Sequence, residues 1–239
     1  MYNLSKKFLF VLSVLAVTMY SCDDSFNEAP FELPDSTPEI KYVNLVRTDD
    51  GPEEYLELTI DILDGDYNFG FQSFDDDPPF QRFDFVLDGS GERIGIGDDP
   101  GNPPFSCIDY QVVFDDFNSQ LDTFLVSQNP LHYNIEVDFF VENPAGSGQF
   151  QLLDWRDVSS IASCGENFYG RFQDPNSSLT GTPFSFEQTG PVSSRLTYAM
   201  RSVGFPLVLG TRPFYIQCSI RDRALNQSNV ITTPEMVFR

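Results

Sequence analysis

Tyr55-Leu56-Glu57-Leu58-Thr59-Ile60-Asp61-Ile62 carries an aliphatic side chain at every second position. Successive side chains of a β-strand point to opposite faces, so this stretch buries one face and exposes Glu57, Thr59 and Asp61. A repeat of two residues, with polar groups between, predicts a strand that covers a hydrophobic core.

The same alternation recurs along the chain, with turn residues between the segments. Strands are predicted over residues 40–46, 83–87, 108–114, 133–141, 196–200, 214–220 and 230–238. One short helix is predicted over residues 155–162, and no longer segment has a 3.6-residue period. Many short strands separated by Gly, Pro, Asn and Asp predict an all-β, antiparallel sandwich of the immunoglobulin or fibronectin type, with long loop insertions.

Residues 39–239 are predicted to form this sandwich. The stretch 75–104 is rich in Pro, Asp and Gly, so it is either a long loop or a hinge. The alternative is therefore two small sandwiches that divide near residues 88–104.

The first residues predict export and lipidation. Lys6 and Lys7 precede an apolar run over residues 8–19, which is shorter than the roughly twenty residues of a membrane-spanning helix. Cys22 follows one small residue, Ser21, as in a lipoprotein signal, although Tyr20 departs from the usual pattern. Residues 1–21 are then a signal peptide, Cys22 carries the lipid, and residues 22–38 form a tether.

The charge excludes some partners. The chain has a net charge of −22, and removal of residues 1–21 takes away Lys6 and Lys7 and no acid, which leaves −24. Nucleic acids and anionic membrane surfaces attract basic patches, so neither is an expected partner. The predicted contact with the membrane is through the lipid on Cys22.

Three cysteines remain after lipidation. Cys218 alternates with Phe214, Ile216 and Ile220, so it is predicted to point into the core. Cys107 and Cys164 fall in irregular segments, and exported proteins form disulfides. We expect a disulfide between Cys107 and Cys164.

Several segments resemble uncharacterised lipoproteins of Bacteroidota. Residues 58–70 resemble their strand followed by a DGDGD-like turn, residues 196–200 one of their later strands, and residues 220–230 their final D-R-A-x-N-x-S-N-V turn. Asp23 and Asp24 directly after Cys22 resemble the surface-export signal of these proteins. The resemblance implies an immunoglobulin-like domain on the outer membrane, facing the cell exterior, and implies no activity.

Asp64-Gly65-Asp66-Tyr67-Asn68 alternates oxygen-bearing side chains, which calcium favours. Asp61 and Asp75–Asp77 are further oxygen donors nearby in the sequence. The other interpretation is an ordinary turn whose side chains bind their own backbone. The later turn, Asp222–Asn229, is predicted to be structural, with Asp222, Asn226 and Ser228 accepting backbone N–H groups.

Catalytic patterns are missing from the sequence. His132 is the only histidine, and it is predicted to lie at the solvent face of a strand with Asn134, Glu136 and Asp138. The sequence contains no G-x-S-x-G, H-E-x-x-H or C-x-x-C motif. We therefore expect no enzyme, and no cofactor apart from the calcium considered above.

Trp155, with Phe150, Tyr169 and Phe172, suggests an aromatic platform for a sugar, although core packing explains the same residues. The expected function is a non-catalytic surface lipoprotein with a structural or binding role and an extracellular protein or glycan partner. The alternative is a glycan-binding accessory of a nutrient-uptake system, and a hydrolase is the third possibility.

Overall fold

The computed structural model describes residues 35–50, 53–71, 75–98, 109–114, 120–155, 167–175, 183–202 and 204–238. Residues Pro34–Arg239 form one compact unit. Cys22, Asp23, Asp24, Cys107 and Cys164 lie outside the described residues, so the lipidation, export signal and disulfide stay predictions. The predicted helix over residues 155–162 lies almost wholly outside them, and the domain boundaries also stay predictions.

The first sheet has four antiparallel strands in the order β1-β2-β9-β8. These strands are β1 (Glu39–Asp50), β2 (Glu53–Leu63), β9 (Ser193–Arg201) and β8 (Phe184–Gly190). The stretch at residues 55–62 lies in β2, where Ile60 pairs with Tyr42 on one side and Leu196 on the other. A strand paired on both sides satisfies its backbone, so its alternating aliphatic face decides the register.

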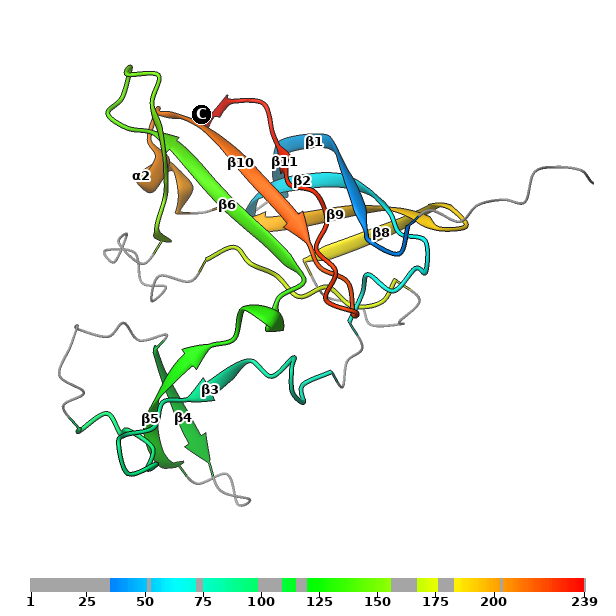
Figure 1. Cartoon of the computed structure of the whole chain (residues 1–239). Coiled ribbons are helices and arrows are strands. Elements are labelled where there is room, and N and C mark those ends of the chain that lie inside the picture. The colour runs from blue at the N-terminus through cyan, green and yellow to red at the C-terminus, as the bar shows by residue number, and fades with distance from the viewer. Residues whose placement is uncertain are drawn as a thin grey trace, which may run out of the picture. The chain divides into compact units, whose positions relative to one another are not determined.

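The second sheet is also antiparallel and runs in the order β11-β10-β6-β7, with β12 paired to β10. Its strands are β6 (Ile135–Glu142), β7 (Phe150–Leu152), β10 (Pro213–Ile220), β11 (Ile231–Thr232) and β12 (Met236–Val237). Figure 1 shows β6 and β10 side by side in front of the first sheet.

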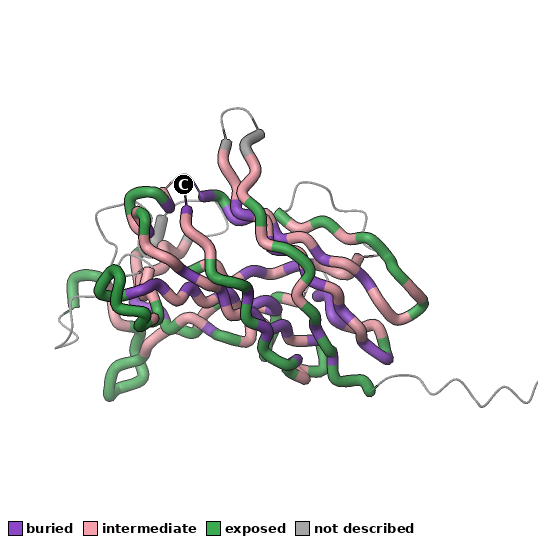
Figure 2. The backbone as a smooth tube through the Cα atoms, turned by 90° about the horizontal axis from the view of Figure 1, so that it is seen from above, coloured by how far each residue is buried: buried purple, intermediate pink, exposed green. Residues whose placement is uncertain are grey.

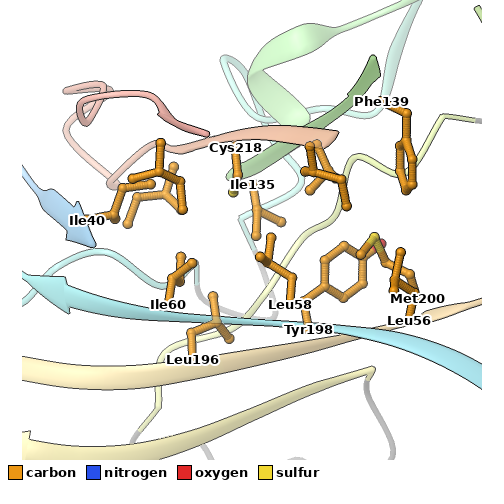
Figure 3. Packing of buried hydrophobic residues seen from close by; sticks show 14 of the residues in the cluster. Ile40, Leu56, Leu58, Ile60, Ile135, Phe139, Leu196, Tyr198, Met200 and Cys218 are labelled. Carbon is orange, nitrogen blue, oxygen red and sulfur yellow. The ribbon is translucent and has the colours of Figure 1, made fainter. Parts of the chain in front are cut away.

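The core lies between these two sheets. Figure 3 shows Ile135, Phe139 and Cys218 of the second sheet pointing toward side chains of the first sheet, among them Leu58 and Tyr198. These five residues are at most 7% exposed. Cys218 is a free, buried thiol, as predicted, and burial raises the pKa of this thiol, which keeps it protonated. Buried stretches follow the strands, while the turns are exposed (Figure 2).

A long insertion separates β2 from β6. It contains β3 (Phe83–Phe85), β4 (Tyr110–Phe114) and β5 (Gln120–Gln128), which form a three-stranded sheet in the order β3-β5-β4. A 3₁₀ helix at Pro130–His132 returns the chain to β6. We call residues 75–128 the insertion; its strands are drawn in teal and green in Figure 1.

The all-β, antiparallel prediction is confirmed, and several elements differ in detail. β5, β7, β8 and the short helix α2 (Phe205–Leu209) were not predicted: β5 and β8 mix polar and apolar residues, and β7 and α2 are too short to show a period. The predicted strand at 230–238 is instead β11 and β12, separated by a turn at Thr233, whose backbone N–H and side chain both bond to Ile216. No helix among the described residues is long and apolar enough to cross a membrane.

The prediction for the strand face near His132 is wrong. Asn134 is fully buried instead of exposed, since its side-chain amide bonds both the N–H and the C=O of Phe172, each at 2.8 Å. His132 lies in the 3₁₀ helix and is half-buried. The alternation of polar and apolar residues does not reveal a polar side chain that is buried because it bonds backbone groups lacking a strand partner.

The final turn is structural, as predicted. The Asp222 carboxylate accepts the N–H of Asn226 at 2.7 Å, and the Ser228 hydroxyl accepts the N–H of Ile220 at 3.0 Å. Asn229 extends this role, because its side chain bonds both the N–H and the C=O of Ile40 in β1. The turn therefore ties the C-terminal strands to the first strand of the opposite sheet.

Candidate functional site

A cleft of about 700 Å³ lies between the insertion and the second sheet. This volume falls in the range of roughly 300–1,000 Å³ that is typical of small-molecule sites. Apolar residues contribute to both walls: Val86, Ile94 and Leu125 from the insertion, and Val137, Phe139 and Leu152 from the sandwich. The cleft thus exists because the insertion folds back over β6 and the residues that follow β7.

The polar lining of the cleft is acidic. Asp109, Asp138 and Asp154 contribute carboxylates, and Asn167 contributes an amide. The described residues that line the cleft include no Lys, Arg or His. Like charges repel in a partly desolvated site, so the cleft disfavours anions and suits a neutral ligand rich in hydroxyl groups, or a cation.

Tyr169 is held in place on one side of the cleft. Its hydroxyl donates a hydrogen bond to Asp138 at 2.9 Å, and its ring meets that of Tyr133 edge to face at 6.0 Å. Burial, with the nearby carboxylates of Asp138 and Glu136, raises the pKa of Tyr169. The hydroxyl therefore stays protonated near neutral pH and keeps Asp138 in a fixed orientation.

Trp155 combines a packing role with a place in the cleft wall. Its ring contacts Phe139, Phe168 and Phe205, with centroids 5.2, 4.8 and 5.3 Å away. Its indole Nε1 is buried and donates no hydrogen bond within the described residues. Most of the ring belongs to the aromatic core, and the rest borders the cleft.

The other aromatics named with Trp155 in the sequence separate. Tyr169 lines the same cleft, whereas Phe172 is fully buried in the core. Phe150 packs on Tyr215, with centroids 5.0 Å apart. The structure therefore brings two of the four aromatic residues to one cleft.

Arg171 fastens the insertion beside the cleft. Its guanidinium donates to the Phe80 carbonyl at 3.3 Å and also to the Asp75 carbonyl, and it lies over the ring of Phe71 at 4.8 Å. Asn129 adds a second attachment, because its amide donates to the carbonyls of Pro79 and Gln81, both at 2.7 Å. These bonds satisfy loop carbonyls that have no strand partner.

His132 has a structural environment. Its Nδ1 atom lies 3.0 Å from both the Phe80 carbonyl oxygen and Arg171 Nη1. Burial and the charges of Arg171 and Arg82 lower the pKa of His132, although the Phe80 carbonyl and Asp76 act in the opposite sense. His132 does not line the cleft, and Nδ1 of its ring contacts an arginine and a carbonyl, an arrangement unlike a catalytic His–acid pair.

The acidic turn does not line the cleft either. Asp64 is fully buried at the end of β2, and Asn68 donates to Asp66 at 2.8 Å. Among the described residues, no group of three or more His, Cys, Asp or Glu side chains is placed to hold a metal ion. A cation at this turn would therefore depend on two carboxylates, together with amide and backbone oxygens.

Asp109, Asp138, Asp154 and Asn167 were not predicted as site residues. Asp138 alternates with core residues and looks like an ordinary exposed strand position. Asp154 stands next to Trp155, which is a local signal, but the position of Asp109 depends on how the insertion folds. No local pattern reveals that these residues meet.

The chain matches no protein-family model, no curated protein and no solved structure.

Proposed function

We propose that this chain is a lipid-anchored, non-catalytic binding protein with an immunoglobulin-like domain, carried on the outside of the outer membrane. The lipid on Cys22 and the acidic pair Asp23-Asp24 supply the anchor and the export signal. The observation that carries the binding role is the cleft between the insertion and β6.

The strand order supports the immunoglobulin-like assignment. An immunoglobulin sandwich has strands A-B-E-D in one sheet and G-F-C in the other, with C′ beside C in some domains. The orders β1-β2-β9-β8 and β11-β10-β6-β7 correspond to A-B-E-D and G-F-C-C′ in chain order. The insertion then occupies the B–C connection, which is one of the ligand-binding loops of variable domains.

The lining of the cleft favours a neutral glycan as the ligand. Trp155 and Tyr169 offer aromatic surface, and the carboxylates of Asp138 and Asp154 can accept hydrogen bonds from sugar hydroxyls. A charged anion would meet three carboxylates and, among the described lining residues, no basic side chain. The role of glycan-binding accessory in a nutrient-uptake system is thus the form of the proposal that this cleft supports best.

A glycan array probed with the purified full chain tests the ligand class. Three variants alter the cleft: Tyr169→Phe, Asp138→Asn and Trp155→Phe. Tyr215→Phe is the matched control, since Tyr215 stacks on Phe140 and does not line the cleft. We expect Tyr169→Phe and Asp138→Asn to weaken binding about tenfold, because one lost hydrogen bond costs roughly 1 kcal/mol or more, and Trp155→Phe to weaken it through the loss of aromatic surface.

The array distinguishes a wrong ligand class from a wrong binding site. If the unaltered chain retains no glycan, the ligand class is wrong. If it binds a glycan that all three cleft variants retain equally, the binding site lies elsewhere. Palmitate labelling tests the anchor independently: Cys22→Ala must abolish it, and labelling that persists in this variant refutes the lipoprotein assignment.

A further inference from the structure

The turn that follows β2 contains an acidic pair in an unusual environment. Asp64 is fully buried, and its backbone N–H bonds the Val192 carbonyl at 3.0 Å. Its own carbonyl accepts the N–H of Tyr67 at 3.2 Å, and Tyr67 adopts a left-handed φ of 56°. This backbone conformation is costly for a non-glycine residue, and it makes residues 64–68 a tight turn.

Two side-chain oxygens in this turn have no hydrogen-bond donor. Asp64 Oδ1 and Asn68 Oδ1 are both buried, and neither has a hydrogen-bond partner among the described residues. The neighbouring atoms are satisfied, since Asp64 Oδ2 accepts the N–H of Asn68 at 3.0 Å and Asp66 Oδ2 accepts the Asn68 side-chain N–H at 2.8 Å. Buried acceptors without a donor are rare, and each requires an explanation.

The charge of the pair is also uncompensated. Within the described ranges, the groups that act most strongly on the Asp64 carboxylate are the carboxylates of Asp66 and Asp222 and the N–H of Asn68, with no cationic side chain among them. Neighbouring carboxylates repel each other, and a cation bound between them relieves this repulsion.

Three of the four other acids considered for a calcium shell lie beside an arginine. Asp61 pairs with Arg195 at 2.7 Å, and Asp75 pairs with Arg223 at 3.1 Å. Asp76 lies 3.7 Å from Arg171. Arginine thus compensates these three acids, while Asp64 and Asp66 have no arginine partner in the part of the chain that the structure describes.

We propose that the turn binds a calcium ion through the carboxylates of Asp64 and Asp66 and the side-chain oxygen of Asn68. These are hard oxygen ligands, as calcium requires, and water completes the six to eight positions of its shell. Two carboxylates make a site of low charge, so the expected Kd is about 10⁻⁴–10⁻³ M, typical of extracellular modules. The site joins the end of β2 to the loop before β9 through the bond from Asp64 to Val192.

Calcium titration of the chelator-treated full chain, by calorimetry and thermal unfolding, tests this proposal. We expect saturable heat and a melting temperature raised by about 3–6 °C when calcium exceeds Kd tenfold. Asp66→Asn should remove both effects and still fold, since Asp66 is exposed. Asp84→Asn is the matched control: it removes one charge from an exposed aspartate in β3 and should leave the calcium response unchanged.

Each alternative result overturns the proposal. If calcium gives neither heat nor a shift in the unaltered chain, the pair shares a proton instead. If Asp66→Asn and Asp84→Asn respond to calcium alike, the ion binds non-specifically to an acidic surface.

Discussion

The sandwich and the insertion are built from similar strands, but different forces hold them. The sandwich buries complete aromatic and aliphatic side chains between two sheets, with Phe139 and Phe214 at 0% exposure. Among the described residues of the insertion, Leu125 and Val126 are the only buried apolar side chains. Leu87 and Ile96 are 55% and 61% exposed there.

The difference in buried apolar surface shows which region contributes most to the folding free energy. Hydrophobic burial contributes roughly 25 cal/mol for each Å² removed from water, so the sandwich supplies most of the folding free energy. The insertion has little apolar surface to bury and depends on hydrogen bonds from Arg171 and Asn129 to loop carbonyls. The cleft thus has one rigid wall and one wall of lower local stability, as ligand-binding regions commonly have.

The largest expected effect is in the sandwich core. Phe139→Ala should lower the free energy of unfolding by about 3–5 kcal/mol, because the cavity it leaves borders four other aromatic rings. Phe85→Ala in the insertion should cost about 1 kcal/mol or less, since Phe85 is only half-buried. Urea denaturation of the full chain measures both. Equal losses would mean that the insertion is as tightly packed as the sandwich.

A buried amide at the junction of the two regions should have the next largest effect. Asn134→Ala leaves the N–H and C=O of Phe172 without partners, which costs about 1–3 kcal/mol for each unsatisfied group. Asn143→Ala is the control, because Asn143 is exposed and its side chain bonds the exposed Gln151. Denaturation curves that coincide for the two variants would contradict the structural role of Asn134.

Arg171→Met should loosen the insertion alone. The change removes the bonds to the carbonyls of Phe80 and Asp75 and keeps a long apolar stem against Phe71. We expect amide hydrogen exchange in β3 and β5 to accelerate about tenfold, while β6 and β10 retain their protection. Uniform acceleration across all four strands would show that the two regions unfold as one.

The smallest effect concerns pH. The pKa of His132 is lowered in the folded chain, so the unfolded chain binds this proton more readily. The stability contributed by neutral His132 is therefore complete above its unfolded pKa of about 6.5, and it is lost as pH falls from there through the lowered folded value. His132→Gln should lose less stability than the unaltered chain between pH 7 and pH 5.

NMR provides a direct reading of the same group, because His132 is the only histidine in the chain. The titration midpoint of its imidazole should lie below 6.5. A midpoint at or above 6.5 would mean that His132 is exposed to solvent, as its position in the sequence suggested.

The two regions also differ in how well the sequence predicts them. β2 and β9 carry unbroken alternation, and the predicted strands match those observed within a few residues. β5 was not predicted, since Gln120–Gln128 mixes polar and apolar residues on both faces. A strand that buries little apolar surface leaves a weak pattern in its sequence.

The same reasoning applies to the sites. The acidic turn could be identified locally, because its oxygen donors lie within five consecutive residues. The tertiary structure decides which nearby aspartates have their charge compensated, because Arg195 and Arg223 lie more than a hundred residues away from them in the sequence. The cleft could not be predicted at all, since Asp109, Asp138 and Asp154 share no local pattern.

The sequence by itself determined the all-β class, the principal strands of the core and the inward face of Cys218. These follow from local periodicity, because burial on one side of a strand requires an apolar residue at every second position. Only the tertiary structure decided that Asn134 is buried, that Trp155 packs on Phe139 and that Tyr169 meets Asp138 at a cleft. Those contacts join segments distant in the chain, and they form only when two sheets and an insertion pack together.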